Sequence, residues 1–112
     1  MRITKETLII FTLTVISLMI MFIGGASNMT VTNSNEGRMP FLADYNHHSD
    51  THFSYQNGST VKYLYLTDRF FLLNQYWSIG DFLLISGFLM FVAICIFVGI
   101  NYYKTKNDKD YY

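Results

Sequence analysis

The residues best suited to chemistry lie in one short segment, residues 47–52, which reads His-His-Ser-Asp-Thr-His. In an extended strand His48, Asp50 and His52 project from one face, because side chains alternate along a strand. Two imidazoles and a carboxylate can bind Zn²⁺ or Cu²⁺. A structural zinc site takes four ligands, however, and this segment contains no cysteine. We therefore expect no cofactor, and keep zinc or copper at these three residues as the alternative.

Signs of catalysis or of nucleic-acid binding are missing from the sequence. No serine, histidine and aspartate stand in a recognisable nucleophile context, and no acids are paired within an apolar segment. The net charge is zero, which gives no electrostatic reason to bind nucleic acid. We expect a protein that is not an enzyme and does not bind nucleic acid.

Two long apolar runs, at residues 8–23 and 82–100, frame the chain and must position everything else. About twenty apolar residues cross a hydrocarbon core of about 30 Å. Charged residues make up 14% of the chain, whereas about 25% is usual for soluble domains. These features predict an α-helical membrane protein, a two-span hairpin with helices over residues 8–25 and 78–101.

The first run also has features of a secretory signal peptide. Basic residues precede it, and the small residues Gly24 and Ala26 stand where a peptidase would cleave. Cleavage there would leave a single-pass protein. We favour a retained membrane anchor and keep the cleaved signal peptide as the alternative.

The distribution of basic residues predicts the orientation in the membrane. Basic residues are denser at the two ends than in the long connection, and cytoplasmic segments carry this excess. The basic residues of the ends are Arg2, Lys5, Lys104, Lys106 and Lys109, against Arg38, Lys62 and Arg69 in the connection. We expect a multi-pass protein of the cell membrane, with residues 1–7 and 102–112 in the cytoplasm and residues 26–77 outside.

The second span has a recognisable start. Ser78 is suited to the N-cap position, where its hydroxyl would accept a hydrogen bond from a free backbone N–H. Asp81, three residues later, would complete a capping box, and its negative charge would be stabilised by the positive end of the helix dipole. We expect both residues to lie at the membrane interface.

The connection between the spans is expected to contain some structure. Residues 27–38 are polar and typical of turns, and Asn57-Gly58 is a strong turn signal. We predict a short β-hairpin around this turn, in which residues 53–55 pair with residues 63–65. The apolar residues 70–73 are too few to span a membrane and are expected to lie on the outer leaflet.

Two further groups suggest contacts. Arg38 could bind a lipid phosphate or form an ion pair with Asp44 or Asp81. Cys95 and Gly99 are small residues four apart in the second span, a spacing that lets helices approach closely. They predict helix packing, either with a partner helix or between copies of this chain.

Two short motifs carry a resemblance to a known family. The segment Glu-Gly-Arg-Met-Pro at residues 36–40, followed by Leu66-Thr67-Asp68, and the segment Trp-Ser-Ile-Gly-Asp at residues 77–81 resemble an uncharacterised bacterial family of small integral membrane proteins. In that family the first element follows one membrane helix and the second begins the last. This chain looks like a shortened form, because family members usually have more helices ahead of the first element. The resemblance implies an architecture and no reaction.

These observations together predict a small bacterial membrane protein that acts as an accessory or regulatory subunit of a larger membrane or envelope complex. Its partners would be the lipid bilayer and either another membrane protein or further copies of itself. Two alternatives remain open: an extracytoplasmic metal- or ligand-binding module, and a self-assembling membrane-active or immunity protein.

Overall fold

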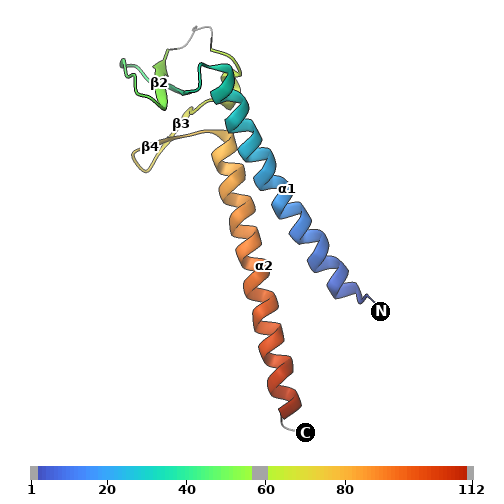
Figure 1. Ribbon diagram of the computed structural model, residues 1–112. Helices are drawn as coiled ribbons and strands as arrows, with labels where there is room; N and C mark the ends of the chain where they lie inside the picture. The colour runs from blue at the N-terminus through green and yellow to red at the C-terminus, as the bar shows by residue number, and fades with distance from the viewer. Residues whose placement is uncertain (1–2, 57–60, 111–112) are drawn as a thin grey trace.

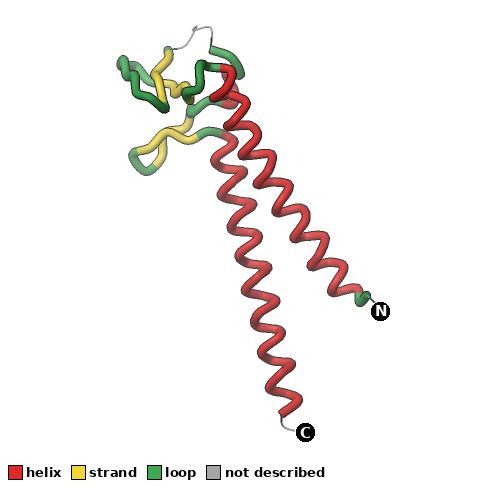
Figure 2. The backbone as a smooth tube through the Cα atoms, in the orientation of Figure 1, coloured by secondary structure: helices red, strands yellow, loops and turns green. Residues whose placement is uncertain are grey.

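The computed structural model describes residues 3–56 and 61–110. Two long helices, α1 (Lys5–Ser34) and α2 (Ile79–Asp110), are joined by a segment with short strands and a 3₁₀ helix (Figure 1). The strands and loops gather at one end of the helix pair (Figure 2). We call residues 35–56 and 61–78 the strand unit. The molecule is elongated, 69 × 29 × 21 Å.

Helix α1 begins and ends at identifiable caps. The Thr4 hydroxyl accepts a hydrogen bond from the backbone N–H of Thr7 at 3.2 Å. The helix continues through Ser34, and Glu36 and Gly37 then take positive φ angles of 60° and 76°. Residues 27–34 are therefore helical, which corrects the expectation of a turn-prone segment there. Packing of this polar end of α1 against the rest of the protein overrides the weak helix propensity of its residues.

Both helices are long and apolar enough to cross a membrane. They contain 30 and 32 residues, and at 1.5 Å per residue each exceeds a hydrocarbon core of about 30 Å. Only 11% and 6% of their most apolar 18-residue windows are buried within the protein. The rest of these windows is an uncovered apolar surface. α2 continues to Asp110, well past the predicted end of the span at residue 101.

The two helices pack through small residues. In α1 the buried residues are Ser17, Gly24 and Val31, seven positions apart, a spacing typical of left-handed helix pairs. A Cβ atom on Gly24 would lie 2.6 Å from the carbonyl oxygen of Gly80, and one on Gly87 would lie 2.8 Å from that of Ser17. The helices are close because these positions have little or no side chain. Farther from the strands they separate toward the two termini (Figure 1).

Strands β1 (Met39–Leu42) and β2 (His52–Tyr55) form a parallel pair in which Met39 lies beside His52 and Leu42 beside Tyr55. The other edge of β1 is bridged to Asp68, which follows the 3₁₀ helix η1 (Leu64–Leu66). Because β1 is central, residues from three distant parts of the strand unit meet around it.

The predicted β-hairpin is wrong in its position. Tyr63 is left-handed, with φ of 55°, and the residues after it form η1, so residues 63–65 cannot pair with 53–55. The predicted turn at Asn57-Gly58 lies outside the described residues. A hairpin forms instead later in the chain, between β3 (Phe70–Leu72) and β4 (Gln75–Trp77). Its turn residues Leu73 and Asn74 have φ of 52° and 59°, the conformation that two-residue hairpin turns need.

Candidate functional site

The candidate site is a buried carboxylate, Asp68, at the junction of the strand unit and the helices. Its backbone N–H donates to the carbonyl oxygen of Pro40 at 3.0 Å, and its carbonyl oxygen accepts from the N–H of Leu42 at 2.9 Å. These two bonds fix Asp68 to the edge of β1. Only 5% of the residue is exposed. A charged side chain is rarely buried to this extent without a partner.

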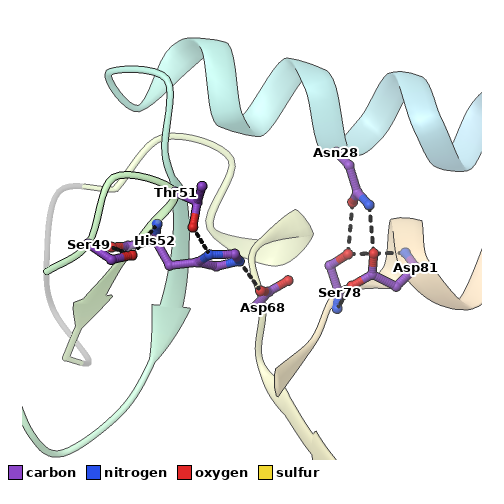
Figure 3. A network of polar contacts seen from close by, with 7 residues as sticks. All are labelled: Asn28, Ser49, Thr51, His52, Asp68, Ser78 and Asp81. Atoms are coloured by element: carbon purple, nitrogen blue, oxygen red, sulfur yellow. Dashed lines mark hydrogen bonds and ion pairs between the residues drawn. The ribbon is translucent and has the colours of Figure 1, made fainter. Parts of the chain in front are cut away.

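The two carboxylate oxygens of Asp68 have different surroundings. Oδ2 lies 3.6 Å from Nε2 of His52, whose other ring nitrogen, Nδ1, is 2.9 Å from the Thr51 hydroxyl. Oδ1 is buried and has no hydrogen-bond partner among the described residues. Figure 3 shows this oxygen pointing toward the side on which Asn28, Ser78 and Asp81 lie. Part of the carboxylate's hydrogen-bonding capacity is therefore unused.

Burial changes the acidity of this carboxyl group. Loss of solvation raises the pKa of Asp68 from 3.8 to about 7, and the negative charge of Asp81 adds to the rise. The group therefore changes charge near neutral pH. A strongly shifted carboxyl group in a cleft is a recognised sign of a functional site.

A cavity of about 360 Å³ opens beside Asp68 and is lined mainly by aromatic rings. The Phe41 ring is central, with its centroid 4.9 Å from that of Tyr76 and 6.2 Å from that of Tyr45. The imidazoles of His47 and His52 also lie against Phe41. The cavity thus combines one buried carboxylate with several aromatic rings.

A second cavity, of about 390 Å³, lies toward the helices and shares Asp68, His52 and Tyr76 with the first. Its remaining lining includes the polar side chains of Asn28 and Asp81. Asp68 therefore lies between an aromatic cavity and a polar one.

Polar side chains join the two helices beside the second cavity (Figure 3). The Asn28 amide donates to Oδ1 of Asp81 at 2.8 Å, and its carbonyl oxygen accepts from the Ser78 hydroxyl at 2.8 Å. The Ser78 N–H donates to Oδ2 of Asp81 at 2.9 Å, and the Asp81 N–H donates to the Ser78 hydroxyl at 3.1 Å. The last two bonds form the capping box expected from the sequence. The contribution of Asn28 is additional.

The three predicted metal ligands are not brought together. His52 faces Asp68, while His48 and Asp50 are exposed. Residues 49–52 form a turn, in which the N–H of Ser49 donates to the carbonyl oxygen of His52 at 2.8 Å, so the alternation expected of a strand does not apply. Within residues 3–56 and 61–110, no group of three His, Cys, Asp or Glu side chains is placed to hold a metal ion.

The predicted ion pairs of Arg38 with Asp44 or Asp81 do not form. The guanidinium group lies 3.1 Å from Glu36 and stacks 5.1 Å from the centroid of the Phe53 ring. Asp81 is instead held by Asn28 and by its own helix cap. The nearby glutamate satisfies Arg38 locally, so it has no need to reach across the structure.

The predicted packing residues Cys95 and Gly99 do not contact α1. Cys95 is exposed, and a Cβ added to Gly99 would meet nothing within 4 Å. They lie where the helices have separated, whereas close packing occurs at Gly80 and Gly87. The seven-residue spacing of these two glycines is the sequence signal for the face that packs against α1, whereas the prediction for Cys95 and Gly99 concerned a partner helix or another copy and stays a prediction.

The sequence analysis named Asp68 only as part of the motif that carries the family resemblance and gave it no role, and it did not name Asn28. Asp68 stands between Thr67 and Arg69 in the sequence, and in the fold it is bridged to β1 and buried. Asn28 follows an apolar run and resembles the start of a loop. Its one visible signal is that a polar residue four positions after Gly24 falls on the packed face of the helix.

No family model, curated protein or solved structure matches this chain.

Proposed function

We propose that this chain is a two-span protein of the bacterial cell membrane, and that it acts as an accessory or regulatory subunit of a larger membrane complex. Both termini would lie in the cytoplasm and the strand unit outside. The excess of basic residues at the two ends supports this orientation. The uncovered apolar surfaces of α1 and α2 support the membrane location.

The packing of the helix pair favours a retained α1 over a cleaved signal peptide. Ser17 and Gly24 form the close contacts with α2, and both precede the predicted cleavage position at Ala26. Cleavage would remove the surface against which Gly80 and Gly87 are fitted. The structure of α2 near the strand unit is thus suited to a chain that keeps its first helix.

The separation of the helices away from the strand unit is the observation that carries the subunit proposal. Between the separated ends lies a cavity of about 290 Å³, lined by Ile9, Ile10 and Phe97, with the polar Glu6 and Asn101. Here α1 and α2 face each other across this cavity. An apolar helix from another membrane protein would fill the space and cover both surfaces, as small and apolar helix faces do in membrane bundles.

The β3–β4 hairpin would lie at the outer surface of the bilayer. Its apolar residues are exposed, and Leu73 at its tip is 90% exposed. The rings of Phe70 and Trp77 contact Phe82 in the first turn of α2, which fixes the hairpin at the level where the apolar helix begins. Aromatic side chains favour this depth.

Photocrosslinking in native membranes tests the subunit role. A photoreactive amino acid would replace Phe97, which lines the cavity between the helix ends, and in a matched control Ile96, which is also exposed but does not line it. We expect position 97 to crosslink to one partner polypeptide and position 96 only to lipid. Native mass spectrometry then identifies a different protein or a second copy of the chain. Lipid adducts alone at both positions would contradict the proposal.

A further inference from the structure

We propose that the aromatic cavity beside Asp68 binds an organic ammonium ion, a positively charged nitrogen that carries carbon substituents. The inference rests on the cavity's own residues and does not depend on the proposed subunit role.

The first argument is charge. The Asp68 side chain lines the aromatic cavity and is 93% buried, given its 7% exposure. A buried carboxylate is costly unless a cation or hydrogen-bond donors compensate it. Among the described residues, the basic side chain that pairs with it is His52, whose Nε2 lies 3.6 Å from Oδ2. No lysine or arginine lines this cavity in the part of the chain that the structure describes. A bound cation would supply the missing charge.

The second argument is the aromatic lining. Phe41, Tyr45 and Tyr76 contribute rings to the cavity, and their negative faces attract cations. Pockets that recognise alkylated ammonium groups combine aromatic rings with an acidic residue in this manner. The volume, about 360 Å³, falls within the range of small-molecule sites, roughly 300–1,000 Å³.

The same residues argue against a metal ion. Divalent metals need several oxygen, nitrogen or sulfur ligands in a defined geometry. The described residues contain no group of three such side chains. Aromatic rings contribute little to metal coordination, but they contact the apolar substituents of an ammonium ion well. The residues of this cavity therefore fit an organic ammonium ion better than a metal ion.

Isothermal titration calorimetry on the full-length protein tests the proposal. The protein would be placed in nanodiscs of phosphatidylglycerol at pH 8, where Asp68 is mainly ionised, and titrated with choline chloride or ethanolamine chloride. Sodium chloride controls for ionic strength. We expect saturable binding of at least one of the two ammonium ions.

Two variants and one control locate the site. Asp68→Asn keeps the shape of the side chain and removes its charge, so binding should weaken about tenfold or more. Tyr45→Ala removes a ring that is 56% exposed and should weaken binding by a few fold. Asp50→Asn, at an exposed acid in the neighbouring turn, should leave binding within about twofold of the wild type.

The lipid composition of the nanodiscs distinguishes the possible sources of the ammonium group. If a lipid headgroup occupies the cavity, adding phosphatidylethanolamine to the nanodiscs should reduce choline binding by the wild type through competition. If the ligand is a free amine or a lysine side chain, this lipid should have no effect. Absence of binding by both ions, or equal binding by the wild type, Asp68→Asn and Tyr45→Ala, would overturn the proposal.

Discussion

The Asn28 amide of α1 donates a hydrogen bond of 2.8 Å to the Asp81 carboxylate in the first turn of α2. The two residues are 53 positions apart in the sequence. The same amide accepts a bond from Ser78, so one side chain of the first helix completes the cap of the second. This contact holds the helices together at the point where the strand unit begins.

Replacement of Asn28 by alanine should destabilise the protein by about 1.5–3 kcal/mol, because it removes two bonds between the helices, one of them to a carboxylate. The free energy of unfolding in detergent would be measured by denaturant titration. Asn33→Ala, at an exposed position of the same helix, serves as the control and should change little. Equal effects of the two substitutions would show that the contact contributes nothing.

The close approach of the helices predicts different effects for two glycines. Gly24→Ala should cost about 1–3 kcal/mol, because its Cβ would lie 2.6 Å from a backbone oxygen of Gly80. Gly99→Ala meets open space and should be neutral or slightly stabilising, since alanine favours a helix. Thermal unfolding of the two variants measures the difference. A larger loss for Gly99→Ala would mean that the helices pack through the other face.

The raised pKa of Asp68 predicts a pH-dependent stability. Its carboxyl group has a pKa of about 7 in the folded protein and 3.8 when unfolded, so between these values the folded state binds more protons. The contribution of this group is most favourable below about pH 4 and is lost as the pH rises through 7. The groups that face Asp68 are His52, on β2, and Asp81, on α2.

Asp68→Asn removes this ionisable group. The difference in stability between the variant and the wild type therefore isolates its contribution from those of the other titrating groups. The variant should gain stability relative to the wild type between pH 5 and pH 8, measured by unfolding at each pH with the same protein preparation. A difference between the two proteins that is constant with pH would refute the assignment.

Much of the fold could be predicted from the sequence because its signals are local. The two apolar runs predict the helices, and the pair formed by Ser78 and Asp81 predicts the start of α2. The strand unit could not be predicted in this way. The residues after Tyr63 favour a strand by composition, yet Tyr63 is left-handed and η1 follows it, while Asp68, farther on, bridges to β1.

The candidate site was predicted only in part for the same reason. His52 belongs to the predicted metal segment, but its actual neighbour, Asp68, is sixteen residues away and is placed there by β1. The predicted partners, His48 and Asp50, depend on a local strand that a turn replaces. Local spacing cannot report contacts that tertiary pairing creates.

The hairpin offers a test that uses the single tryptophan of the chain, Trp77, as the reporter. In vesicles its fluorescence should be quenched by lipids brominated near the headgroup end of the acyl chains, and only weakly by aqueous iodide. Leu73→Asp should reverse this preference, because it places a charge at the exposed tip. Tyr63→Asp, exposed elsewhere in the strand unit, should not. Strong iodide quenching of the wild type would place the hairpin in water.

Cysteine labelling in intact cells tests the two-span arrangement most directly. Cys95 is the only cysteine, so a Cys95→Ala background allows single cysteines to be introduced by Asp44→Cys in the strand unit and Lys106→Cys near the end of α2. A membrane-impermeant maleimide should label position 44 in intact cells, and position 106 only after the membrane is permeabilised. Labelling of position 106 in intact cells, or protection of position 44, would contradict the account.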